Sequence, residues 1–224
     1  MKTSKNTLLT LALVAGALAA TSAQTALANS ITYGLQFAPS GYKVYTGWAA
    51  GVTPVQATTP PPFFGPDAGT TFTLGTATLT FTGGTNYNLQ GADPASSINT
   101  LNHAFYLSNS STQIAATLSG LSASDTVNFQ FIESYQPFSP TVDVNGATSG
   151  SLSGSAASSP DGSAFVDLGS LSGNTSYTIS VPYSGAGEAD LSGALITITP
   201  APEPATLAVL GLGAAGLLFR RRKA

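Results

Sequence analysis

Few residues in this chain have side chains suited to hydrolytic chemistry. The only histidine is His103, and Ser108 lies close to it in the sequence. A serine nucleophile needs a positioned base, but the chain has no Gly-x-Ser-x-Gly elbow. Glu133 and Glu188 could form the carboxylate pair of a glycoside hydrolase, although any acidic residues could pair by chance. We therefore expect no catalytic residues and no enzyme activity, and a glycan-acting hydrolase is the alternative.

Two short segments carry oxygen ligands that could bind calcium. They are Asp143-Val144-Asn145-Gly146 and Asp161-Gly162-Ser163. Calcium takes six to eight oxygen ligands, and neither segment has that density. Both are typical of turns, and Asn145-Gly146 is the strongest hairpin signal in the chain. We expect no metal site and no cofactor, with a structural calcium ion held by separate loops left open.

Several aromatic side chains could stack on the apolar faces of sugar rings. Tyr45 and Trp48 lie close together, and Phe63 and Phe64 follow three consecutive prolines in a polar segment. These four are the candidate carbohydrate contacts. The alternative for Trp48 is core packing, because it would share one strand face with Tyr42.

Four threonines alternate along one segment, at Thr76, Thr78, Thr80 and Thr82. Alternation places them on one face of a strand, and a flat array of threonines is the surface that several ice-binding proteins use. Threonine is also favoured on any solvated strand face. A single strand is too narrow for an array, so ice binding remains a further alternative.

The composition excludes several classes of protein. Only 8% of the 224 residues are charged, against about a quarter in an ordinary globular protein. Residues 29–199 hold nine acidic residues and one basic residue, Lys43, so we expect no binding to nucleic acid. The absence of cysteine excludes disulfides and thiolate metal sites.

The N-terminus has the pattern of a secretory signal. Lys2 and Lys5 precede an apolar run that ends at Ala20. Ala26 and Ala28 fit the small-x-small cleavage pattern, which predicts that the mature chain starts at Asn29; a cut after Ala23 is the alternative. We expect residues 1–28 to form a signal helix handled by the Sec translocon and signal peptidase.

The C-terminus, residues 200–224, has three parts in order. Pro202-Glu203-Pro204 comes first, an apolar run follows, and the end is the basic cluster Arg220, Arg221, Arg222 and Lys223. The apolar run would reach ~22 Å as a helix at 1.5 Å per residue. It is short for a bilayer core, but it could span by local thinning. We expect a short transmembrane helix in the inner membrane, with the basic cluster anchored in the cytoplasm.

This combination resembles the PEP-CTERM sorting signal of Gram-negative bacteria, and the same tail is also catalogued as an ice-binding protein C-terminal domain. The resemblance implies recognition by an exosortase, a membrane protease that processes the tail near Pro202-Glu203-Pro204. It further implies an exported, membrane-anchored precursor that reaches the cell surface or the extracellular matrix. An association with exopolysaccharide is implied as well.

Residues 29–199 have the pattern of one all-β domain. Ser and Thr make up 48 of these residues and Gly 20, a composition that favours strands and turns over helices. Period-2 alternation predicts about ten strands, at 31–37, 42–48, 71–82, 105–107, 113–118, 127–131, 141–144, 164–168, 176–181 and 195–199. We read residues 58–66 as a long surface loop and residues 149–163 as a loose segment. The predicted fold is a single β-sandwich or jelly roll.

Short segments of this domain resemble galactose-binding-like jelly rolls. They are Ile31 to Phe37 with the Pro39-to-Tyr42 turn, Leu118 to Leu121, and Val144-Asn145-Gly146. The resemblance implies a carbohydrate-binding role. We therefore expect a non-enzymatic surface or matrix protein that is associated with polysaccharide.

Overall fold

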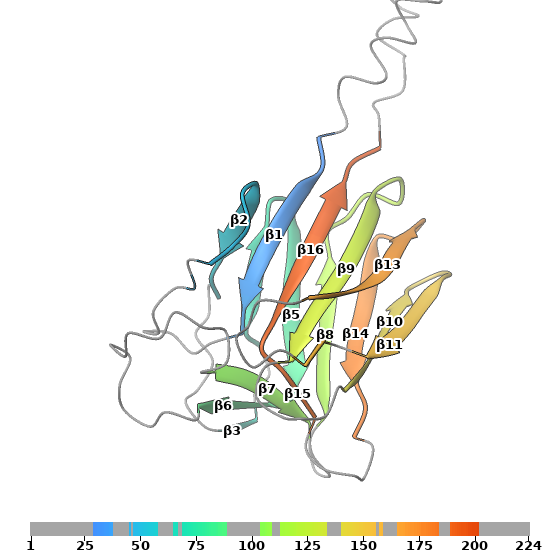
Figure 1. Ribbon diagram of the computed structural model, residues 1–224. Coiled ribbons are helices and arrows are strands. Elements are labelled where there is room, and N and C mark those ends of the chain that lie inside the picture. The colour runs from blue at the N-terminus through green and yellow to red at the C-terminus, as the bar shows by residue number, and fades with distance from the viewer. Residues whose placement is uncertain are drawn as a thin grey trace, which may run out of the picture. The chain divides into compact units, whose positions relative to one another are not determined.

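The computed structural model describes the greater part of the predicted domain (Figure 1). The described residues are 29–37, 45, 47–57, 65–66, 69–88, 104–108, 113–133, 140–155, 157–158, 165–183 and 189–201. They contain strands and no helix, and Ser30–Thr199 form one compact unit. None of the described residues belongs to a helix long and apolar enough to cross a membrane.

The described strands form two six-stranded sheets and one four-stranded sheet. Sheet A has the order β12-β9-β16-β1-β2, and β13 also pairs with β9. Sheet B has the order β11-β10-β14-β8-β5-β4, and sheet C has the order β15-β7-β6-β3. The all-β prediction is confirmed, and the two larger sheets are consistent with a β-sandwich. The strand bounds are β1 Ile31–Gln36, β2 Val52–Val55, β3 Gly65–Pro66, β4 Thr71–Leu74, β5 Ala77–Gly83, β6 Thr85–Asn88, β7 Ala104–Ser108, β8 Ile114–Ser119, β9 Thr126–Glu133, β10 Thr141–Gly146, β11 Ser151–Ser155, β12 Ala157–Ser158, β13 Val166–Ser172, β14 Ser176–Val181, β15 Ala189–Leu191 and β16 Gly193–Thr199.

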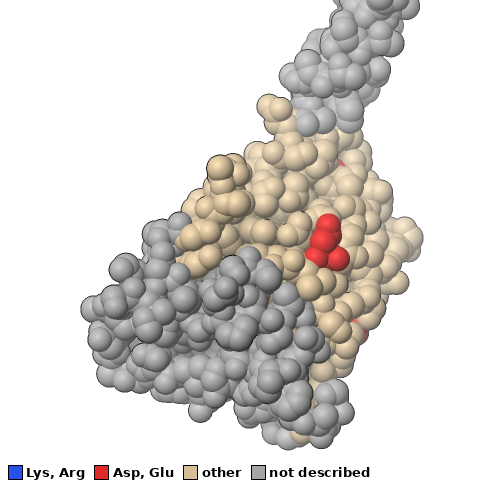
Figure 2. Space-filling view, in the orientation of Figure 1, with Lys and Arg blue, Asp and Glu red and all other residues tan. Residues whose placement is uncertain are grey.

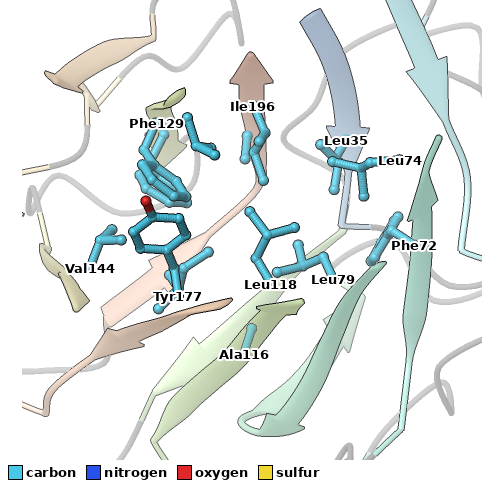
Figure 3. Packing of buried hydrophobic residues seen from close by; sticks show 14 of the residues in the cluster. Leu35, Phe72, Leu74, Leu79, Ala116, Leu118, Phe129, Val144, Tyr177 and Ile196 are labelled. Atoms are coloured by element: carbon cyan, nitrogen blue, oxygen red, sulfur yellow. The ribbon is translucent and has the colours of Figure 1, made fainter. Parts of the chain in front are cut away.

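The core lies between sheets A and B. Alternate residues of each strand point inward, because successive strand side chains face opposite sides of a sheet. Sheet A contributes Leu35 and Phe129, while sheet B contributes Phe72 and Leu118 (Figure 3). Their relative exposure is 0%, so the core excludes water. Phe37 makes edge-to-face contacts with Phe72 and Phe81 at centroid distances of 5.8 and 5.1 Å.

The last strand of the domain occupies the middle of sheet A. β16 pairs antiparallel with β1 from Gly193 to Ile198 on one side, and with β9 along its whole length on the other (Figure 1). Its inward residues Ala194, Ile196 and Ile198 belong to the core. Sheet A is therefore complete only when the chain has reached Thr199.

Two of the predicted strands are wrong in detail. The segment 71–82 is a hairpin rather than one strand, because Gly75 has a φ of 66° and reverses the chain between β4 and β5. Thr76 consequently lies in the turn. The predicted strand 42–48 is absent at its described positions, since Tyr45, Gly47 and Trp48 lie in a loop.

The hairpin predicted at Asn145-Gly146 exists, but its turn is displaced. Asn145 and Gly146 belong to β10, and the positive φ of 83° falls at Gly150. A Cβ on Gly146 would collide with the Ser149 carbonyl oxygen and the Asn174 amide. Glycine is thus required here by a close approach and not by a left-handed backbone. The segment read as loose contains β11, which pairs with β10.

Asn174, which lies between β13 and β14, stabilises this turn through its side chain. Its side chain is 1% exposed. Oδ1 accepts hydrogen bonds from the Thr148 backbone N–H at 2.8 Å and from Thr148 Oγ1 at 2.7 Å. Nδ2 donates to the carbonyl oxygens of Ser149 and Ser172 at 2.7 and 3.2 Å. A buried amide satisfied in this way fixes the register of β10 and β11.

Tyr177 brings a hydroxyl into the core beside Phe129 (Figure 3), with ring centroids 5.4 Å apart. Within the described part of the chain this hydroxyl has no hydrogen-bond partner. An unpaired buried polar group costs about 1–3 kcal/mol.

Tyr177→Phe should therefore leave the free energy of unfolding unchanged or raise it by about 1 kcal/mol, measured by denaturant titration. Tyr177→Leu, which also removes the ring contact, should lower it. A loss of stability in Tyr177→Phe would show that the hydroxyl is satisfied.

Candidate functional site

A pocket lies on the outer face of sheet A, the face turned away from the core. Strand alternation places Gly34, Gln130 and Leu195 on this face, since their neighbours along each strand are core residues. The loop before β2 passes over them. The pocket has a volume of about 290 Å³ and is lined by Tyr45, Gly47, Trp48, Ala49, Val52, Gln130, Phe165 and Leu195.

Three aromatic rings line the pocket. Tyr45 and Trp48 meet edge to face, with centroids 4.9 Å apart and planes at 89°. Trp48 and Phe165 are tilted by 34° at 6.1 Å. Tyr45 packs on Ile132, and its backbone N–H donates to Gln36 Oε1 at 2.9 Å. The loop is thus fixed to sheet A by an aromatic cluster and by a hydrogen bond.

Gly34 creates the space in which the Trp48 ring lies. A Cβ at this position would be 2.6 Å from Trp48 Cε3, 2.7 Å from Trp48 Cδ2 and 2.8 Å from Val52 Cγ1. Carbon atoms do not approach so closely, so any larger residue must displace the indole ring. The glycine therefore allows Trp48 to pack directly on the backbone of β1.

Polar groups border the pocket on the same face. Gln130 Nε2 donates to Asn128 Oδ1 at 3.2 Å, and Asn128 Nδ2 donates to Asp167 Oδ1 at 2.8 Å and Ser170 Oγ at 3.3 Å. The Gln130 amide is thereby oriented with its oxygen left to accept a further hydrogen bond. An apolar aromatic wall with a few placed polar groups is the usual composition of a small-molecule site.

The described lining residues include no carboxylate, histidine or lysine. Acid–base hydrolysis requires a titratable group within reach of the reacting atoms. The described lining residues therefore offer aromatic rings and an amide to a ligand, and no carboxylate, imidazole or amine.

Of the four predicted carbohydrate contacts, the structure brings together Tyr45 and Trp48. Phe63, Phe64, His103 and Glu188 lie outside the described residues, as do the side chains of Ser108 and Glu133. The sequence did not identify Phe165 or Gln130 as partners of Trp48. No local signal could have done so, because these residues meet only through the pairing of β13, β9, β16 and β1.

Of the two segments considered as calcium ligands, only the one that contains Asp143 lies among the described residues. Asp143 lies within β10. No group of three or more acidic or histidine residues that could hold a metal occurs among the residues described. Asp161 to Ser163 lie outside them, as does the predicted signal-cleavage site at Ala26 and Ala28.

The outer face of sheet B carries a row of polar side chains across all six strands, five with hydroxyl groups and one, Asn145, with an amide. Thr80 of β5 pairs with Thr71 of β4 on one side and with Thr117 of β8 on the other. The row continues through Thr178, Asn145 and Ser151. The predicted threonine line is therefore one column of a two-dimensional array, although Thr76 does not belong to it.

The hydroxyl groups on the two outer faces differ in their hydrogen bonding. On sheet A, Thr32 and Thr197 bond to each other through their Oγ1 atoms at 2.8 Å. On sheet B, the hydroxyls of Thr80, Thr117 and Thr178 make no side-chain hydrogen bond within the described structure. These groups are available to water or to an external surface.

Positive charge is absent from the part of the domain that the structure describes. These residues include no Lys or Arg, and Figure 2 accordingly shows isolated acidic patches and no basic ones. The described residues of the two outer faces therefore offer no cation for ion pairing with an anionic polymer.

Comparison with known proteins identifies the C-terminal segment. The family model of the PEP-CTERM protein-sorting motif matches residues 200–223. This match confirms the predicted resemblance: the chain is a PEP-CTERM-containing protein, and the motif implies exosortase-dependent sorting of an exported protein. No curated protein and no solved structure matches the chain.

The packing of Trp48 on Gly34 can be tested by fluorescence, because Trp48 is the only tryptophan in the chain. Gly34→Ala should push the indole ring into water and shift its emission to longer wavelength, with a stability loss of about 1–3 kcal/mol from overpacking. Thr117→Val, on the outer face of sheet B, is the control and should leave the emission unchanged. An unchanged spectrum in Gly34→Ala would contradict the described contact.

Proposed function

We propose that this protein is a non-enzymatic component of the cell surface or extracellular matrix of a Gram-negative bacterium. In this proposal the exosortase processes the precursor while the C-terminal helix holds it in the inner membrane, and the released domain associates with exopolysaccharide. The observation that carries the polysaccharide association is the pocket of Tyr45, Trp48 and Phe165.

The chemistry of the pocket supports a neutral sugar unit as its ligand. The C–H face of a sugar ring is apolar and can pack on an indole or phenyl ring, and buried aromatic area contributes strongly to binding. Gln130 supplies an oriented amide for a sugar hydroxyl. The net charge of −8 on residues 29–199 argues against an anionic sugar.

Isothermal titration of the exported protein with the producing organism's own exopolysaccharide tests this function. Saturable heat is expected. Trp48→Ala and Phe165→Ala should each weaken binding by about tenfold or more, as expected for the loss of a central aromatic contact. Thr197→Val, outside the pocket on the same face, should bind like the wild type.

Two results would contradict the proposal. Full affinity in both alanine variants would exclude the pocket as the contact. New reducing ends during the titration would favour the alternative, a glycan-acting hydrolase, because a binding module releases no product.

A second candidate function, ice binding, is favoured by one observation. The polar row on sheet B, five hydroxyl residues and Asn145, spans six strands, with neighbouring strands about 4.8 Å apart and alternate residues about 6.7 Å apart. A regular array of hydroxyl and methyl groups can order the water beside it. The sequence had indicated only one strand, which would be too narrow.

Thermal hysteresis of the purified protein tests ice binding. A measurable freezing-point gap is expected, and Thr117→Lys should abolish it, because a long charged side chain would interrupt the centre of the row. Ser170→Lys on sheet A is the matched control and should retain the gap. A wild-type protein without hysteresis would rule this candidate out.

A further inference from the structure

The C-terminal end of β16 is held on both sides up to its last residue. Thr199 pairs with Thr126 of β9, and its Oγ1 lies 2.8 Å from the Oγ of Ser30, the residue just before β1. Two residues earlier, Thr32 and Thr197 repeat the same side-chain contact at 2.8 Å. The sheet therefore extends to the last residue before the sorting motif.

The matched sorting motif begins immediately after this strand. It covers residues 200–223, so only Pro200 and Ala201 separate Thr199 from Pro202-Glu203-Pro204. At about 3.3–3.6 Å per extended residue, Pro202 can lie no more than about 11 Å along the chain from Thr199. Proteases act on extended, accessible segments, and cleavage in a folded region follows the population of its locally opened state.

The end of β16 is well placed to open locally. Of the last two residues of β16, only Ile198 belongs to the core, and its side chain is 9% exposed. Its partner Ile31 is 44% exposed, so the core is thin at this end. By contrast, Ile196 is completely buried and should resist opening. Strand ends with little buried apolar surface are the first to unpair.

We propose that the end of β16 is part of the segment that the sorting enzyme grips, so that processing requires Ile198 and Thr199 to leave sheet A. The inference rests on the proposed processing by an exosortase. Removal of the tail breaks one peptide bond: the acyl carbon passes to an enzyme nucleophile and then to water or an amine, and the tail leaves with a free amino group. The sheet controls only how often the bond becomes accessible.

A reversible cross-link at the strand end tests this inference. The chain has no cysteine, and the close contact of the Ser30 and Thr199 hydroxyls suits a disulfide between their positions. In cells that produce the exosortase, the oxidised full-length Ser30→Cys/Thr199→Cys protein should be processed at about one tenth of the wild-type rate or more slowly. A membrane-permeable reductant should restore the wild-type rate, as read from the mass of the pulse-labelled product.

The matched control is Thr32→Cys/Thr197→Cys. Its cross-link joins the same two strands at an equivalent position of the antiparallel ladder, but it leaves Ile198 and Thr199 free to unpair. Processing should stay close to the wild-type rate. A second variant inserts a flexible Gly/Ser spacer between Thr199 and Pro200 of the Ser30→Cys/Thr199→Cys protein, ahead of the matched motif, which should restore processing without reduction.

Each outcome supports or overturns the inference. Wild-type processing of the oxidised Ser30→Cys/Thr199→Cys protein would overturn it, as would equal slowing in the control or a spacer without effect. A wild-type chain that keeps its tail in the presence of the exosortase would instead reject the processing function itself. The two failures are therefore distinguishable.

Discussion

The structure depends on the pairing of β16 between β1 and β9. This strand joins the first and last parts of the domain, places Ile196 in the core and completes sheet A. Because its contacts are distant in sequence, loop-closure entropy must be overcome before they stabilise the fold. The described sandwich can therefore form fully only after Thr199 is free to pair. The sorting motif starts at residue 200, directly after this last strand. The residues that complete the fold and the residues of the sorting segment are therefore neighbours in the chain.

The outer faces show how a domain with few charges can stay hydrated. Sheet A pairs several of its hydroxyls and amides with one another beside an aromatic pocket, whereas on sheet B the hydroxyls of Thr80, Thr117 and Thr178 make no side-chain hydrogen bond within the described residues. Six of the seven basic residues of the chain lie in the predicted signal segment and the tail. The domain itself has nine acidic residues and Lys43, a net charge of −8. The net negative charge makes copies of the domain repel one another.

The sequence predicted most of the long strands because their buried residues alternate, as in β8 and β14. It did not predict their partners, since pairing across the whole domain leaves no local pattern. The sequence predicts a single strand over 71–82 because glycine, here Gly75, occurs at bulges within strands as well as at turns. Trp48 was assigned to a strand because its neighbours alternate, but the space over Gly34 places it on the outer face. Short edge strands such as β2 and β12 carry too few residues for a pattern.

The most direct test of the account is the mass of the protein's C-terminal peptide in cells with and without the exosortase. The account predicts a chain that is cleaved near Pro202-Glu203-Pro204 and released to the surface or matrix when the enzyme is present. Without the enzyme, the chain should retain the tail through Ala224 and stay in the membrane fraction. An identical C-terminus in both strains would contradict sorting by this motif.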